Sequence, residues 1–98
     1  MKGASARISP YWVYMLQCSD KTLYTGITND LRRRIREHNS GSASKYTRSR
    51  RPVSLVYAEA ADGKSEALKR ETAIKNMSRS AKLLLSTAYS AGNRHGVR

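Results

Sequence analysis

The stretch from residue 23 to residue 38, LYTGITNDLRRRIREH, contains the features that decide the fold. It begins as a short strand, is expected to turn at Gly26, and starts a helix at the Thr-Asn-Asp cluster of residues 28–30. Leu31 and Ile35 lie four residues apart, which is the minimal apolar stripe of a packed helix. The stretch therefore predicts a strand that is followed closely by a helix.

This helix is predicted to direct a basic group and an imidazole along one surface. At about 100° per residue, Arg34 falls beside the apolar stripe and His38 falls within it. Tyr24 lies just upstream, on the strand that precedes the helix. A tyrosine, an arginine and a histidine that converge on one cleft are typical of a site that handles phosphate groups. The remaining arginines of the helix are expected to point outwards: Arg32, Arg33 and Arg36.

The rest of the chain predicts one small α+β domain at residues 11–89, built on a three-stranded antiparallel sheet. The run YWVYMLQ at 11–17 is rich in aromatic and β-branched residues, as strands are. A polar loop then leads to the strand at 23–28, and the short distance between the two runs favours antiparallel pairing. The order is strand, strand, helix, strand, helix, helix. The remaining predicted segments are a disordered lead-in at 1–10, a helix at 31–39, a loop at 40–52, a strand at 53–60, helices at 64–77 and 79–89, and a flexible tail at 90–98.

The charge of the chain predicts a polyanionic partner. Nineteen Lys and Arg residues stand against seven Asp and Glu residues, which leaves a formal net charge of +12. Residues 32–51 concentrate this charge, because they include eight basic residues and only one acidic residue. Nucleic acid is the usual partner of such a protein. A solvated basic face remains the alternative interpretation of the arginine-rich helix.

Cysteine content and hydropathy indicate a cytoplasmic protein that does not enter a membrane. Cys18 is the only cysteine, so the chain cannot form an internal disulfide bond. A single free cysteine fits a reducing compartment. No apolar segment approaches the length of a membrane span, and the N-terminal residues lack the apolar region of a signal peptide.

Glu71 is the most informative acidic residue. It falls between Ala67, Leu68 and Ile74 on the expected buried face of the helix at 64–77. A carboxylate in such surroundings needs compensation by a cation, a metal or several donors. It could form a salt bridge with one of the arginines. It could also bind Mg²⁺, which commonly takes one or two carboxylates together with water and phosphate oxygens.

Four further side chains are candidates for chemistry, and each has a structural alternative. The planar fork of Arg34 suits two phosphate oxygens, or the residue could form an ion pair with Glu71. His38 could transfer a proton or orient water, or it could be a core histidine. Tyr14 and Tyr24 lie on adjacent strands and could direct their hydroxyls to one point, or could simply pack. As a base, either phenol would need a nearby cation to stabilise the phenolate.

Taken together, these residues resemble the GIY-YIG nuclease superfamily, and in particular its small stand-alone bacterial members. The specific part is Y-x-G-x-T-x-x-L-x-x-R-x-x-x-H from Tyr24 to His38, preceded by Val13-Tyr14-Met15 and followed by Glu71. The resemblance extends over roughly residues 11–85. It implies a metal-dependent phosphodiesterase that acts on nucleic acid, usually DNA.

The resemblance also implies roles for individual residues. Tyr14 and Tyr24 correspond to the two motif tyrosines, one of which activates water. Arg34 corresponds to the arginine that stabilises the phosphate, and His38 to the auxiliary histidine. Glu71 corresponds to the ligand of a single divalent ion, Mg²⁺ or Mn²⁺. Gly26 corresponds to the motif glycine that keeps the turn tight.

We therefore expect a Mg²⁺-dependent endonuclease-like domain that favours DNA over RNA. A non-catalytic module that binds nucleic acid through the same basic face is the main alternative, and a basic RNA- or ribosome-associated protein is a third. Lys45 and Tyr46, in the predicted loop, are expected to contact the substrate strand. The residues expected to bind nucleic acid are Arg32, Arg33, Arg36, Lys45, Tyr46, Arg48, Arg50 and Arg51.

Overall fold

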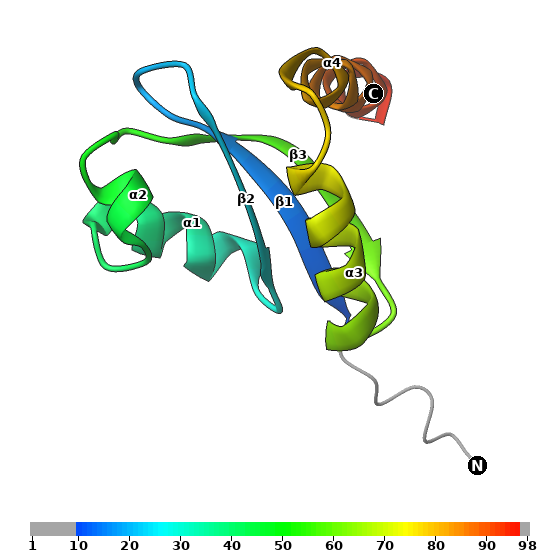
Figure 1. Cartoon of the computed structure of the whole chain (residues 1–98), viewed down its shortest axis with the longest axis horizontal. Helices are drawn as coiled ribbons and strands as arrows, with labels where there is room; N and C mark the ends of the chain where they lie inside the picture. The colour runs from blue at the N-terminus through cyan, green and yellow to red at the C-terminus, as the bar shows by residue number, and fades with distance from the viewer. Residues whose placement is uncertain (1–9, 97–98) are drawn as a thin grey trace.

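The computed structural model describes residues 10–96, which form a three-stranded sheet with helices on both faces (Figure 1). This architecture confirms the predicted α+β class and the antiparallel sheet. The predicted lead-in at 1–10 lies outside the described residues, apart from Pro10. The elements are β1 (Tyr11–Gln17), β2 (Leu23–Thr28), α1 (Leu31–Ser40), α2 (Lys45–Arg48), β3 (Ser54–Ala61), α3 (Lys64–Lys75) and α4 (Arg79–Gly96).

The sheet has the order β2-β1-β3, and both neighbouring pairs are antiparallel. In the β1–β2 pair, Tyr14 lies opposite Gly26 and Leu16 lies opposite Tyr24. Directly opposed residues direct their side chains to the same face of a sheet. The register therefore places Tyr14 and Tyr24 on one face, as the motif required.

Each face of the sheet has its own apolar core. Tyr14 and Leu16 form one core with Cys18 and Val53, and α1 packs against it through Leu31 and Ile35. On the other face, strand residues pack against α3, and the buried members of that core are Val13, Met15, Ala67 and Ile74. Figure 1 shows α1 and α2 on one side of the sheet and α3 on the other. The alternation of β1 side chains between two apolar layers explains why its sequence is continuously hydrophobic.

Helix α1 begins and ends at capped positions. The Asp30 side chain accepts a hydrogen bond from the Arg33 backbone N–H at 3.1 Å, as N-cap residues do. At the other end, Gly41 has a φ of 89° and donates its N–H to the His38 carbonyl. A left-handed conformation of this kind favours glycine. The caps thus set the bounds of the helix that carries Arg34 and His38.

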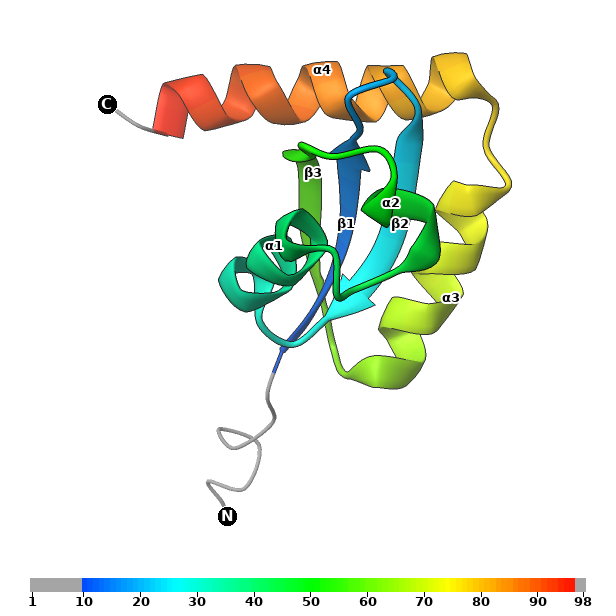
Figure 2. The same ribbon diagram turned by 90° about the vertical axis from the view of Figure 1, so that its left-hand side faces the viewer.

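Two predictions about the other helices were wrong. The predicted loop at 40–52 contains a short helix, α2, whose N-cap Ser44 accepts a hydrogen bond from the Thr47 N–H. The predicted tail at 90–98 is helical as far as Gly96, because α4 does not end at Tyr89; residues 97–98 lie outside the described part. Figure 2 shows α4 running across the end of the sheet beyond α3. Among residues 10–96, no helix is long and apolar enough to cross a membrane.

Candidate functional site

The core of the site is the contact between Tyr14 and Gly26. We expected Gly26 to form a turn, but it lies inside β2, so that prediction was wrong. A Cβ atom at this position would meet Tyr14 Oη at 2.6 Å and Tyr24 Cε2 at 3.2 Å. The glycine is required because the phenol of Tyr14 lies directly across its backbone.

A chain of buried hydrogen bonds extends from Tyr14 through α1 to α2. Tyr14 Oη lies 2.9 Å from His38 Nε2, and His38 Nδ1 lies 2.8 Å from Thr47 Oγ1. The hydroxyl oxygens of Thr47 and Ser44 are 2.9 Å apart. His38 and Thr47 are completely buried, and Tyr14 is 1% exposed. His38 is therefore both a core residue and a hydrogen-bond partner of Tyr14.

Tyr24 packs against His38 and Tyr14, on the solvent side of the hydrogen bonds that join them. Its ring centroid lies 5.0 Å from that of His38 in an edge-to-face arrangement, and 6.5 Å from that of Tyr14. The ring of Tyr46 stacks on Tyr24 with centroids 6.0 Å apart. The Arg50 guanidinium lies 3.8 Å from the Tyr46 ring centroid. Helix α2 and the residues that follow it thus hold Tyr24 in place from the solvent side.

The surroundings of Tyr14 and His38 keep both side chains neutral at physiological pH. Burial raises the pKa of Tyr14 to about 12, the Arg34 guanidinium opposes this rise, and the charges on Tyr24 and Glu71 add to it. Burial and, to a smaller extent, the positive charge of Arg34 lower the pKa of His38 to about 4, although the charge of Glu37 acts in the opposite direction. At neutral pH the Tyr14 phenol is therefore protonated and the His38 imidazole carries no charge.

Arg34 lies between the phenol and the surface. Its Nη1 donates to Glu37 Oε1 at 3.0 Å. Its buried Nε has no hydrogen-bond partner among the described residues. Hydrogen bonding with Tyr14 raises the pKa of Arg34, so the guanidinium remains charged. The expected alternative, an ion pair with Glu71, is not recorded in residues 10–96.

Glu71 approaches the site from α3, which packs on the opposite face of the sheet from α1. Its carboxylate is close enough for its charge to raise the pKa of Tyr14. The side chain is 16% exposed, and its Oε2 lies 3.3 Å from Lys75 Nζ. Among the described residues, Glu71 forms no hydrogen bond or ion pair with Arg34 or with either phenol. Leu68, which we expected on the buried face beside Glu71, is 43% exposed instead.

A groove of about 270 Å³ runs along the β2 edge of the sheet, close to Tyr24. It brings together two tyrosines, from β2 and α2, and two lysines, from α3 and α4. Sequence reasoning missed both lysines; the position of Lys75, one helical turn after Glu71, was the available signal. Its lining residues are Leu23, Tyr24, Thr25, Tyr46, Lys75 and Lys82.

The basic residues predicted to bind nucleic acid fall into two groups. Arg32, Arg33, Arg36, Lys45 and Arg48 are exposed. In contrast, Arg50 donates to Asp20 Oδ2 at 3.0 Å and to the Tyr46 carbonyl at 2.8 Å. These bonds give Arg50 a structural role in addition to its charge.

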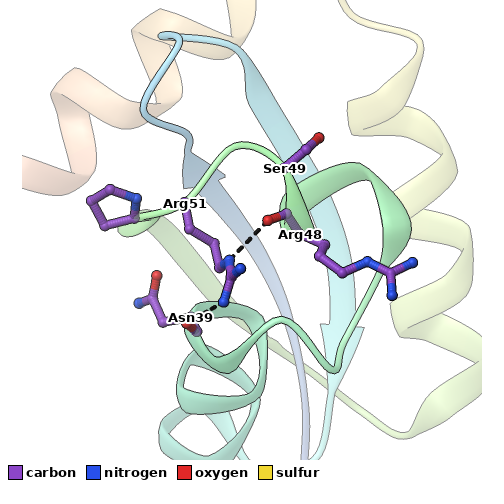
Figure 3. Close-up of a pocket in the computed structure, with 5 residues that line it drawn as sticks. Asn39, Arg48, Ser49 and Arg51 are labelled. Carbon is purple, nitrogen blue, oxygen red and sulfur yellow. Dashed lines mark hydrogen bonds between the residues drawn. The ribbon is translucent and has the colours of Figure 1, made fainter.

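Arg51 also has structural bonds, and it lines a second cavity. Its Nε donates to the Arg48 carbonyl at 2.8 Å and its Nη1 to the Asn39 carbonyl at 3.3 Å, as Figure 3 shows. The cavity, of about 540 Å³, lies between the end of α1 and the segment after α2. In Figure 3 the Arg48 guanidinium points away from Arg51.

Among residues 10–96, the expected divalent ion has a single candidate ligand, the carboxylate of Glu71. Within residues 10–96, no group of three or more His, Cys, Asp and Glu side chains could surround a metal. Glu71 nevertheless offers a largely buried carboxylate whose only recorded partner is one lysine. Mg²⁺ suits such a site, since it retains water and takes phosphate oxygens from its substrate.

Comparison with known proteins identifies relatives over most of the chain. The family model described as the GIY-YIG catalytic domain matches residues 10–84. A "UPF0213 protein" of Syntrophus aciditrophicus is 57% identical over 79 residues, which cover 80% of this chain and 91% of that protein. Another, from Lactiplantibacillus plantarum, is 48% identical over 89 residues, which cover 89% of this chain and 88% of the relative.

Two solved structures are also similar. The solution NMR structure of a UPF0213 protein from Bacillus halodurans has 43% identity and a TM-score of 0.52, and the match covers 81% of this chain and 84% of that chain. The solution NMR structure of a protein from E. faecalis has 36% identity and a TM-score of 0.56, with coverage of 84% and 88%.

Proposed function

This chain belongs to the GIY-YIG family and has its nuclease-like domain, and from that premise we propose that it is an endonuclease that hydrolyses phosphodiester bonds, with DNA as the preferred substrate and Mg²⁺ or Mn²⁺ as the cofactor. The observation that carries the proposal is the convergence of the motif side chains. Tyr14 and His38 form a buried pair, the partly exposed Arg34 lies beside them, and the charge of Glu71 reaches Tyr14 from the other face of the sheet.

Arg34 is the group that meets the scissile phosphate. Its side chain is 31% exposed, and its buried Nε has no partner among the described residues, so protein groups do not saturate the guanidinium. A guanidinium can offer two parallel N–H groups to a phosphate and stabilise the charge that develops on its oxygens. Glu37 holds Nη1 and thereby fixes the orientation of the planar fork.

Tyr14 takes the proton of the attacking water, and Tyr24 positions the substrate. Of the two motif phenols, Tyr14 is the one with a recorded hydrogen bond to an imidazole and to a guanidinium, which are groups that stabilise a phenolate. Tyr24 lines the groove at the β2 edge, where a nucleic-acid strand reaches the site. Because the pKa of Tyr14 is raised to about 12, we expect cleavage to become faster as pH rises above neutrality.

Glu71 is the residue that would hold the divalent ion, as the chemistry of its carboxylate allows. When bound, the ion would supply positive charge beside the phosphate and offset the Glu71 charge that raises the pKa of Tyr14. Lys75 is the cation that Glu71 contacts in the free protein.

The exposed arginines of α1 bind the phosphate backbone without reading sequence. Arg32, Arg33 and Arg36 lie on the same helix as Arg34, so a strand held by them passes the site. Lys45 and Arg48 extend this basic surface onto α2. Binding of this kind weakens steeply as the salt concentration rises.

The decisive experiment compares Glu71→Gln with Glu66→Gln. Both changes remove one carboxylate charge from α3, but Glu66 is exposed and pairs with Lys69 at 3.4 Å. Cleavage of branched, single-stranded and duplex DNA, and of matched RNA, would be measured with Mg²⁺, with Mn²⁺ and with a chelator. Metal-dependent cleavage that is lost only in Glu71→Gln supports the proposal.

Three outcomes would contradict the proposal, each in a different part. Salt-sensitive binding with no metal-dependent cleavage by the wild-type protein would identify a non-catalytic binding module with this fold. Tighter binding to RNA than to DNA at the same salt concentration would remove the DNA preference. Equal cleavage by both variants would remove the role assigned to Glu71.

A further inference from the structure

The groove at the β2 edge is lined by side chains from both faces of the sheet. Tyr24 packs against the core that contains Leu16, whereas Thr25 is opposed to Met15, which belongs to the core beneath α3. Within residues 10–96 the sheet order β2-β1-β3 leaves the outer edge of β2 without a neighbouring strand. The groove therefore lies where a sheet edge offers backbone N–H and C=O groups to a ligand.

Two tyrosine rings form the aromatic part of the groove. Tyr24 and Tyr46 lie within 24° of parallel, with their ring centroids 6.0 Å apart, and Tyr46 is 38% exposed. Arg50 holds Tyr46 in place, because its guanidinium lies 3.8 Å from the ring centroid and donates to the Tyr46 carbonyl. Asp20 in turn accepts from Arg50 Nε at 3.0 Å. The Tyr46 ring is thus accessible but fixed, as a platform for stacking must be.

Thr25 supplies a polar group that has no partner in the free protein. The residue is 5% exposed and lines the groove, and its hydroxyl forms no hydrogen bond with any of residues 10–96. Buried hydroxyl groups are normally hydrogen-bonded, to protein, to water or to a ligand. A ligand in the groove can therefore supply the partner that the protein does not.

Lys75 and Lys82 make the same groove cationic. Lys75 lies on α3 and Lys82 on α4. Lys75 Nζ is 3.3 Å from the Glu71 carboxylate, whereas Lys82 forms no ion pair within the described part of the chain. Aromatic rings, a free hydroxyl and two ammonium groups together suit a nucleotide, which has a flat base with a polar edge and a phosphate on each side.

The groove suits one nucleotide outside a duplex. Its volume of about 270 Å³ is just below the usual range for small-molecule pockets. In a duplex, the neighbouring base pairs cover both faces of each base, so a base must leave the stack before it can contact Tyr46. Stacking of unpaired bases on aromatic side chains is the common way in which proteins bind single strands.

We propose that the groove binds one unpaired nucleobase of the substrate, which stacks on Tyr46 with its polar edge at Thr25, while Lys75 and Lys82 bind the flanking phosphates. This inference rests on the proposed function and adds a requirement to it. Tyr24 joins the groove to the site, because its ring centroid is 5.0 Å from that of His38. The substrate must therefore present an unpaired nucleotide near the scissile bond.

Binding in the presence of a chelator, so that no cleavage occurs, tests the requirement. The probes are an oligothymidylate of about 12 nucleotides, an abasic chain of the same length and a duplex of the same length. A duplex has twice as many phosphates, so electrostatic attraction alone would favour it. We expect the oligothymidylate to bind roughly tenfold more tightly than the abasic chain, and more tightly than the duplex. Binding no tighter than that of either other probe would overturn the inference.

Tyr46→Leu and Tyr46→Phe form a matched pair of variants. Leucine removes the ring and keeps an apolar side chain, whereas phenylalanine keeps the ring. We expect Tyr46→Leu to bind the oligothymidylate roughly tenfold more weakly and the abasic chain unchanged, and Tyr46→Phe to bind both as the wild type does. Wild-type affinity of Tyr46→Leu for the oligothymidylate would contradict the inference.

Thr25→Val tests the polar contact separately, since valine keeps the shape of the side chain and removes its hydroxyl. We expect this variant to bind the oligothymidylate roughly fivefold more weakly, as the loss of one hydrogen bond predicts, and the abasic chain unchanged. Equal weakening for both chains would show that Thr25 does not contact a base.

Photocrosslinking locates the base in the wild-type protein, whether or not any variant folds. A single strand that contains 5-iodouracil forms crosslinks with aromatic side chains in contact with the base, and mass spectrometry identifies the residue. We expect Tyr46 or Tyr24, and crosslinks confined to residues outside the groove would overturn the inference. Base-dependent binding without metal-dependent cleavage would support this subsite and count against the proposed function. Cleavage without base-dependent binding would do the reverse.

Discussion

The hydroxyl oxygen of Tyr14 lies 2.6 Å from the point that a Cβ atom on Gly26 would occupy, and its ring carbon Cζ lies 2.8 Å from that point. The two residues are directly opposed in the β1–β2 pair. A real side chain at residue 26 would therefore displace the phenol from His38. The spacing of this family motif reflects a steric requirement inside a strand.

Gly26→Ala should destabilise the protein and reduce cleavage. Overpacking in a core costs about 1–3 kcal/mol, and here the neighbour that must move is the motif phenol. Urea denaturation measures the first effect and a DNA cleavage assay the second. Gly92→Ala is the control, since a Cβ there meets nothing within 4 Å and Ala is the better helix former. Equal stability of the two variants would contradict the steric explanation.

Tyr14→Phe should reduce cleavage by about 10²–10⁴-fold, which is the usual contribution of a general base. Binding of DNA should remain, because the lost hydroxyl is 2.9 Å from His38 and is buried away from the basic surface. Tyr24→Phe keeps the ring that lines the groove and should have the smaller effect on the cleavage rate. A larger loss of rate in Tyr24→Phe would exchange the roles of the two phenols.

The stability of the fold should decrease below pH 6.5 because of His38. The pKa of this residue is lowered to about 4 in the folded protein, against about 6.5 when unfolded. Between these values the unfolded state binds more protons, so the free energy of unfolding falls as pH falls, by roughly 3 kcal/mol in total. The contribution is fully present above pH 6.5. The free energy of unfolding of the wild type and of His38→Gln, measured by denaturation at several pH values, isolates this effect. If it changes with pH in the same way in both proteins, His38 is not the source of the effect.

Arg51→Ala should reduce the stability of the fold, whereas Arg48→Ala should reduce DNA binding. Arg51 donates to the carbonyls of Arg48 and Asn39, so its loss should reduce stability by about 1–2 kcal/mol. The Arg48 side chain has no hydrogen bond recorded within residues 10–96, and its loss should leave stability within about 0.5 kcal/mol. Arg48→Ala should instead weaken DNA binding. Thermal denaturation and a binding titration on both variants separate the two roles.

The groove lysines should contribute to binding although neither lies in the arginine-rich stretch. Lys75→Gln and Lys82→Gln should each weaken DNA binding. Each should also make the plot of log affinity against log salt concentration less steep, by about the amount that one phosphate contact contributes. Lys69→Gln removes the same charge from the exposed face of α3 and is the control. If all three variants bind alike, the groove is not part of the path of the nucleic acid.

Local sequence patterns were sufficient to predict the three strands, helices α1 and α3, and the start of α4. The helical spacing of Leu31, Ile35 and His38 predicted the side of α1 that packs against the sheet. These signals depend on residues that are close in sequence, so they can be read without knowing the fold. The same spacing placed Arg34 beside the buried stripe, where the structure has it.

Tertiary packing decided the rest. The requirement for Gly26 depends on Tyr14 in another strand, and the partner of His38 is Thr47, on a short helix that has no periodic pattern of its own. The groove lysines and the approach of Glu71 depend on how α3 and α4 pack around the sheet. Such relationships join residues far apart in the chain, and the free energy that holds them comes from burial of the whole core. Composition and local spacing therefore define the motif, whereas the assembled core determines which groups support it.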